Sequence, residues 1–116
     1  MKVLVCGGRD YSDRRSLYET LDTMHFANPI KQIIAGGANG ADMLAADWAQ
    51  MRGVGLHTFR AEWETHGKKA GPLRNQKMLD EGKPELVVAF PGGRGTADMV
   101  RRARTAGVRL LEVTNG

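Results

Sequence analysis

The hydrophobic positions of this chain form two kinds of pattern that alternate along its length. Short, mostly apolar runs predict strands at residues 1–6, 31–35, 55–59, 85–90 and 109–113. Between them, apolar residues recur every three or four positions, which predicts helices over residues 12–26, 40–52, 72–81 and 95–106. Glycine or proline follows shortly after each helical segment, as is typical of helix ends. Ser12 or Asp13 is the expected cap of the first helix.

Residues 60–71 follow neither pattern. They are polar and aromatic without a period, which predicts a long surface loop that carries Trp63, His66, Lys68 and Lys69. Two interpretations of Trp63 stay open. In the first, residues 62–66 form a flap in which Trp63 stacks on a base. In the second, Trp63 packs on the edge of the sheet.

The alternation of strands and helices indicates a parallel sheet with helices on both faces, joined by right-handed crossovers. With five strands, the expected order is 3-2-1-4-5, which is that of a Rossmann-like α/β fold. The length of 116 residues predicts a single domain over residues 1–116. Ligands of such sheets bind beyond the carboxyl ends of strands 1 and 4, where the strand order reverses. The loops after strands 1, 2 and 4 are therefore expected to be neighbours.

These three loops are all rich in glycine. They comprise residues 7–10, 36–42 and 91–96. Taken singly, each is most simply a tight turn, but three such loops at one crevice favour a binding site. Backbone N–H groups and helix N-termini are suited to a phosphate with a sugar beside it. Thr96 is either a further ligand of the phosphate or the cap of its helix.

Several other chemistries are disfavoured. The loops lack both the Gly-x-x-x-x-Gly-Lys-Ser/Thr and the Gly-x-Gly-x-x-Gly spacing, so neither ATP hydrolysis nor a dinucleotide cofactor is expected, and no cofactor is predicted. The three histidines have no metal-ligand spacing, so no metal site is predicted. The single cysteine, Cys6, is expected to be a small buried side chain and not a nucleophile.

Three longer motifs resemble those of one known group of proteins. The motifs are Gly36-Gly37-Ala-x-Gly-Ala-Asp42, Gly71-Pro-x-Arg74-Asn75-x-x-Met78 and Pro91-Gly-Gly-x-Gly-Thr96. Together they resemble the SLOG superfamily of Rossmann-like proteins, in particular its YspA-like branch. That superfamily includes the LOG phosphoribohydrolases and the DNA-processing proteins related to DprA. The resemblance implies a pocket for a nucleotide or a nucleotide-derived ligand.

The loops and the resemblance together define one set of candidate binding residues. It consists of Gly7, Gly8, Arg9, Gly36, Gly37, Ala38, Gly40, Asp42, Arg74, Asn75, Pro91, Gly92, Gly93, Arg94, Gly95 and Thr96. Arg74 is predicted in the first turn of its helix, where a cation opposes the helix dipole, so an anionic ligand would relieve that conflict.

The same resemblance puts catalysis in doubt. In the phosphoribohydrolases the third motif continues to a glutamate, which acts with an arginine that maps onto Arg74. The glutamate position is Met99 in this chain, and Met99 carries no acid. Asp98 lies about 100° away around the helix and has a simpler role at the helix dipole. The candidate catalytic residues are therefore Arg74 and Asp42, for hydrolysis of an N-glycosidic bond. Asp42 equally suits stabilisation of its helix start.

Charge leaves a second class of function open. The net charge is +4, and Arg101, Arg102 and Arg104 give the last helix a basic surface. A DprA-like nucleic-acid-binding module is the alternative, although the interleaved aromatic residues of single-strand platforms are missing. No signal peptide or long apolar segment is visible, so a cytoplasmic location without a membrane partner is expected. A homodimer or higher homo-oligomer is left open.

Overall fold

The computed structural model describes residues 1–114 and contains one five-stranded parallel sheet. The strands lie in the order β3-β2-β1-β4-β5, which confirms the order expected from the sequence. Val3 of β1 pairs with Ile33 of β2 on one side and with Leu86 of β4 on the other. The strands are β1 Lys2–Cys6, β2 Gln32–Ala35, β3 Gly55–Thr58, β4 Leu86–Ala89 and β5 Arg109–Glu112.

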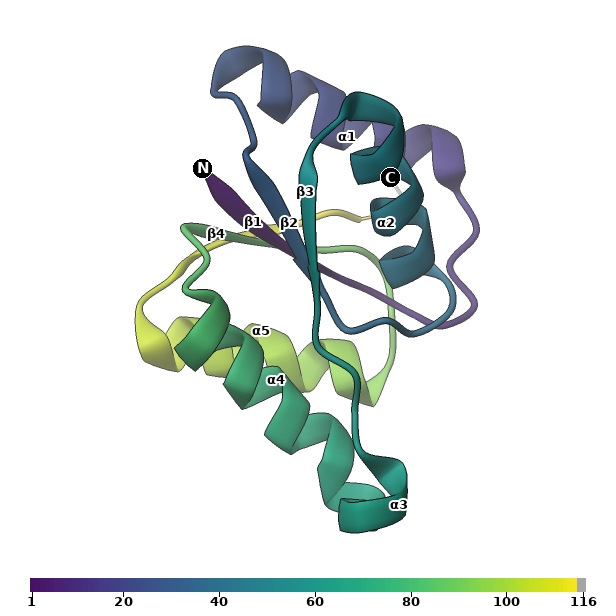
Figure 1. Cartoon of the computed structure of the whole chain (residues 1–116), viewed down its shortest axis with the longest axis vertical. Coiled ribbons are helices and arrows are strands. Elements are labelled where there is room, and N and C mark those ends of the chain that lie inside the picture. The colour runs from purple at the N-terminus through teal and green to yellow at the C-terminus, as the bar shows by residue number, and fades with distance from the viewer. Residues whose placement is uncertain (115–116) are drawn as a thin grey trace.

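The helices cover both faces of the sheet (Figure 1). Helices α1 (Arg14–Ala27) and α2 (Ala41–Arg52) pack on one face, and α4 (Ala70–Gly82) and α5 (Arg94–Ala106) pack on the other. Side chains of a strand alternate between the two faces, so β1 contributes to both. Val3 and Val5 face the first pair of helices, whereas Leu4 and Cys6 face the second. Burial raises the pKa of the Cys6 thiol to about 12, so Cys6 stays protonated.

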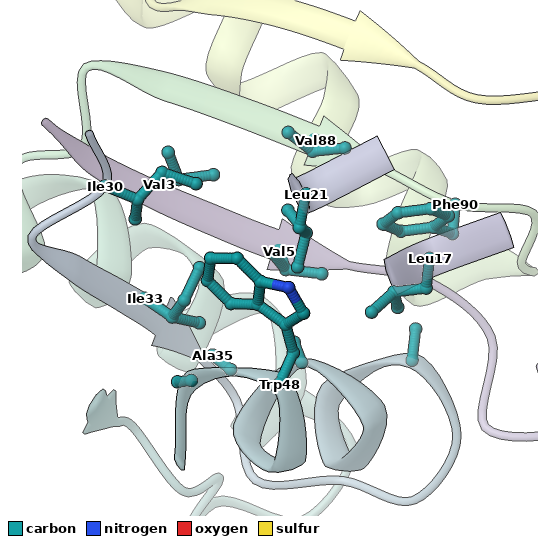
Figure 2. Packing of buried hydrophobic residues seen from close by; sticks show 13 residues of the cluster. Val3, Val5, Leu17, Leu21, Ile30, Ile33, Ala35, Trp48, Val88 and Phe90 are labelled. Carbon is teal, nitrogen blue, oxygen red and sulfur yellow. The ribbon is translucent and has the colours of Figure 1, made fainter. Parts of the chain in front are cut away.

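A separate hydrophobic core lies on each face of the sheet. Trp48 of α2 is the largest side chain in the core between the sheet and helices α1 and α2. It is fully buried, and Figure 2 shows it among Val5, Leu21 and Ile33. Its indole N–H donates a hydrogen bond of 2.8 Å to Asp22 of α1. The polar atom of this residue is therefore satisfied at the edge of an apolar core.

The helix ends agree with the sequence signals to within a residue or two. Asp13 caps α1, because its carboxylate accepts a hydrogen bond of 3.0 Å from the Ser16 amide. Gly53 and Gly107 end α2 and α5 in the left-handed conformation. None of the helices in residues 1–114 is long and apolar enough to span a membrane.

The prediction of a long loop over residues 60–71 is wrong. This segment contains a short helix α3 (Trp63–His66) and a 3-10 turn η1 (Gly67–Lys69), and it runs directly into α4. The Glu62 carbonyl accepts hydrogen bonds from the amides of Thr65 and His66, which closes the turn of α3. One helical turn is too short to show a hydrophobic period. Helix α4 consequently begins at Ala70, two residues before Pro72.

Candidate functional site

The loops after β1, β2 and β4 meet at the carboxyl ends of these strands, as expected. One residue, Gly8, joins all three. The Gly8 amide donates to the Pro91 carbonyl at 2.9 Å, and the Gly8 carbonyl accepts from the Ala41 amide at 3.2 Å. The loop after β1 is thereby fixed to the loop after β4 and to the start of α2.

The glycines of these loops serve two different purposes. At Gly8 an added Cβ would lie 3.1 Å from the Pro91 carbonyl oxygen, and at Gly92 it would lie 2.6 Å from the Gly8 nitrogen. Gly40 has a φ of +75° and faces the Gly8 carbonyl. These glycines let the loops pack against one another. At Gly93 and Gly95, in contrast, an added Cβ would meet nothing within 4 Å.

A cavity of about 1130 Å³ opens beside these loops. Most of the predicted binding residues line it. Gly36 and Gly37 instead line a smaller adjoining cavity of about 300 Å³, and Gly40 lines neither. The predicted residues at the main cavity are Gly7, Gly8, Arg9, Ala38, Asp42, Arg74, Asn75, Pro91, Gly92, Gly93, Arg94, Gly95 and Thr96.

The start of α5 forms one wall of this main cavity. The helix has no side-chain cap, and its first amide bonded within the helix is that of Ala97, which donates to the Gly93 carbonyl at 3.0 Å. The amides of Arg94, Gly95 and Thr96 precede it and therefore lack a partner within the helix. Thr96 is the third residue of α5, so the interpretation of Thr96 as the helix cap is wrong.

Arg74 projects from α4 to the loop after β2. Its guanidinium donates to the Gly36 carbonyl at 2.9 Å and to the Asn75 side chain at 3.0 Å. An added Cβ at Gly36 would collide with this guanidinium, so Gly36 makes room for it. Because α4 begins at Ala70, Arg74 lies one turn into the helix and not in its first turn. The predicted conflict with the helix dipole is correspondingly weaker.

Asn75 connects Arg74 to the start of α5. The side chain is buried, accepts from Arg74, and donates to the Gly95 carbonyl at 3.2 Å and to the Asp98 carboxylate at 3.0 Å. Its amide group is fully engaged within the protein. Asn75 therefore holds α4 against the glycine-rich end of α5.

Asp42 is a buried carboxylate at the cavity. It accepts a hydrogen bond of 3.2 Å from the Ala38 amide. Burial raises the pKa of Asp42, and the Ala38 amide and the positive charge of Arg74 offset this only in part. Asp42 therefore takes up a proton more readily than an exposed aspartate does.

Asp98 and Met99 point in different directions. Met99 is fully buried against the sheet, beside Leu4 and Val87, and does not line the cavity. Asp98 does line it, although the sequence assigned it only to the helix dipole. Burial raises the pKa of Asp98, but hydrogen bonds from Arg102 and Asn75 outweigh it, and the pKa is lowered overall. In the sequence, Met99, Val100 and Ala103 have the spacing of the buried face of a helix. That spacing predicts that Asp98 lies on the face of α5 turned away from the sheet.

Three of the four arginines of α5 form ion pairs. Arg101 and Arg102 both bind Asp98, and Arg104 binds Glu112 of β5 at 2.7 Å. The basic surface expected from the sequence is thus largely neutralised by neighbouring carboxylates.

Trp63 of α3 borders the main cavity and is half-exposed. The Arg9 guanidinium lies 5.4 Å from the centre of its ring. This position agrees with the flap interpretation. The sequence did not single out Tyr11 or Lys68 as binding residues, although both line the same cavity. The Tyr11 hydroxyl is buried without a hydrogen-bond partner among residues 1–114.

Comparison with known proteins places this chain in a family. A model described as "YspA, cpYpsA-related SLOG family" matches residues 1–66, which is more than half of the chain. The chain belongs to this SLOG family. The resemblance drawn from the three motifs is thereby confirmed. The Gene 61 protein of Mycobacterium phage D29 is similar, with 40% identity over 118 residues that cover 95% of this chain and 94% of that protein.

Solved structures share the fold of this SLOG protein. DNA processing protein A (DprA) from Streptococcus pneumoniae matches with a TM-score of 0.79 at 19% identity, over 99% of this chain and 50% of that one. The chain therefore spans about half the length of that DprA structure. Phosphoribosylglycinamide formyltransferase from Coxiella burnetii, solved with CHES, matches with a TM-score of 0.50 at 16% identity, over 93% and 61% of the two chains. Membership of the SLOG family supports a function related to nucleotides or nucleic acid.

Proposed function

We propose that this protein binds a nucleotide or nucleotide-derived ligand in the main cavity. The start of α5 carries the proposal. There, three backbone amides without helical partners and the positive end of the helix dipole meet the open space beside Gly93 and Gly95. The phosphate of the ligand lies over these glycines, with the Arg94 side chain beside it.

The remaining walls suit the rest of a nucleotide. Arg74 and Asp42 line the same cavity and supply a charged donor and an acceptor for sugar hydroxyls. Trp63 offers an aromatic face to the base. The volume of about 1130 Å³ is ample for a whole nucleotide.

A thermal-shift experiment with Gly93→Val tests this proposal. Nucleoside 5′-monophosphates of four bases should raise the melting temperature of the native protein, and Gly93→Val should abolish that rise. A Cβ at Gly93 would meet nothing within 4 Å, so there is open space for the larger valine side chain beside the helix start. The melting temperature of the variant without ligand, measured alongside, separates loss of folding from loss of binding. Gly93→Ala, with its smaller side chain, should reduce the shift only in part. An unchanged shift in Gly93→Val would overturn the proposed phosphate position.

Hydrolysis of the N-glycosidic bond is a second candidate function, favoured by Asp42. In this reaction water attacks the anomeric carbon and loses a proton, the bond to the base breaks, and the departing base nitrogen takes up a proton from solvent. Asp42 lies in the cavity beside Arg74 and can accept the proton of the attacking water. Base release measured by chromatography should be lost in Asp42→Asn. Full activity in this variant would remove Asp42 from the reaction.

Binding of nucleic acid is the alternative, and the ion pairs of α5 count against it. A groove that contacts several phosphates needs free cations, whereas Arg101, Arg102 and Arg104 are already paired. Tight DNA or RNA binding that falls steeply with salt, together with no response to nucleotides, would favour this alternative.

A further inference from the structure

The distribution of ion pairs among the arginines is uneven. Among residues 1–114, six of the eleven arginines form ion pairs with carboxylates. Four of the remaining five line the two cavities, and the fifth, Arg109, lies on the edge strand β5. The four unpaired arginines at the cavities are Arg9, Arg60, Arg74 and Arg94.

Three of these four arginines converge on the smaller cavity. Arg9, Arg60 and Arg74 line its volume of about 300 Å³ together with the loop after β2 and Trp63. Burial lowers the pKa of Arg74, the nearby Asp42 raises it, and the charge of Arg9 is close enough to lower it further. No carboxylate lines this cavity in the described part of the chain.

Arg60 distinguishes the smaller cavity from the main one. It follows β3, is exposed, and is held by a hydrogen bond of 3.2 Å to the Gly37 carbonyl. It lines only the smaller cavity, whereas Arg94 lines only the main one. Arg9 and Arg74 line both and stand between the two volumes.

We infer that the smaller cavity is a second anion subsite, built by Arg9, Arg60 and Arg74, for a phosphoryl group on another part of the same nucleotide. Three guanidinium groups line this cavity and outnumber the nearby carboxylate of Asp42, so the excess positive charge favours a doubly charged oxyanion. The inference rests on the proposed function, which places the first phosphate at the start of α5. Because Arg60 and Arg94 line different cavities, the two phosphoryl groups sit at separate positions of the ligand and not in one pyrophosphate.

Isothermal titration calorimetry with three matched probes tests this subsite. The probes are the nucleoside 5′-monophosphate, the 5′-diphosphate and the 3′,5′-bisphosphate of one base, repeated for four bases. The bisphosphate should bind at least about tenfold more tightly than the monophosphate. Arg60→Ala should remove this gain and leave monophosphate affinity unchanged. The diphosphate adds comparable charge at the first site, so its affinity should not respond to Arg60→Ala.

Two further variants make the outcome decisive. Arg109→Ala removes one positive charge from an arginine that is also unpaired but lies outside both cavities, and it should leave all three affinities unchanged. Arg60→Gln removes the charge but retains a long polar side chain. It should behave like Arg60→Ala, and agreement between the two variants would show that the effect does not come from misfolding of the alanine variant. Monophosphate binding without a bisphosphate gain, or equal losses for all probes in Arg60→Ala, would overturn the subsite alone. Absence of binding by all three probes would overturn the proposed function as well.

Discussion

Asp98 and Met99 are adjacent in α5, but the turn of the helix places them in different surroundings. Asp98 sits at the cavity wall, and Met99 is fully buried against the sheet. The acid that the related phosphoribohydrolases are expected to use is thus replaced by a core side chain. Asp98 accepts hydrogen bonds from Arg102 and Asn75, which outweigh its burial and lower its pKa, so its carboxylate is a weaker proton acceptor than that of Asp42.

Restoring the acid by Met99→Glu is therefore expected to damage the protein. A carboxylate in this apolar position has no partner, and such a buried charge costs about 3 kcal/mol or more of unfolding free energy. Met99→Leu conserves volume and should cost less than about 1.5 kcal/mol. Urea denaturation of the two variants measures both losses. A Met99→Glu protein of native stability that releases bases from nucleotides would show that this account of α5 is mistaken.

The element that the sequence failed to predict is the helical segment before α4. Residues 63–69 contain one turn of α3 and one of η1, and neither is long enough to display a period. Trp63 of α3 also meets Arg9 from a distant loop, a contact that no local pattern encodes. The longer helices could be predicted because each carries an apolar face that recurs over three or more turns.

Helices α1 and α2 are joined by Asp22, and this contact has a measurable effect on stability. Asp22 accepts hydrogen bonds from the buried Trp48 indole at 2.8 Å and from Arg52 at 2.8 Å. Asp22→Ala would leave the Trp48 N–H without a partner and should lower the unfolding free energy by about 1–3 kcal/mol. Asp22→Asn keeps an acceptor and should lose less. Thermal denaturation followed by tryptophan fluorescence gives both values. Equal losses in the two variants would contradict this role of the hydrogen bond.

The same contact predicts a dependence on pH. The hydrogen bond from Arg52 lowers the pKa of Asp22 from 3.8 to about 2. Since the folded pKa lies below the unfolded one, the stability gained from ionised Asp22 is present above about pH 4 and is lost as the pH falls towards 2. Unfolding measured between pH 5 and 2 should show a shallower loss for Asp22→Asn than for the native protein. Parallel curves would mean that Asp22 contributes nothing to acid unfolding.

At the scale of the whole molecule, the strand order brings three distant loops to one end of the sheet. The sequence predicted this convergence, because alternating strands and helices admit few arrangements. It did not predict the role of each glycine. Gly8, Gly40 and Gly92 serve contacts between loops, whereas Gly93 and Gly95 face open space. That distinction depends on which backbones approach one another, and only the folded chain shows it.

Amide NMR of the isotope-labelled protein would detect a nucleotide phosphate over the start of α5. Titration with a nucleoside 5′-monophosphate should shift the amide resonances of Arg94, Gly95 and Thr96 most strongly, because their N–H groups bind the phosphate. The shifts should saturate and should be lost in Gly93→Val. Unmoved resonances at these three amides, or shifts confined to the outer face of α5, would contradict the account.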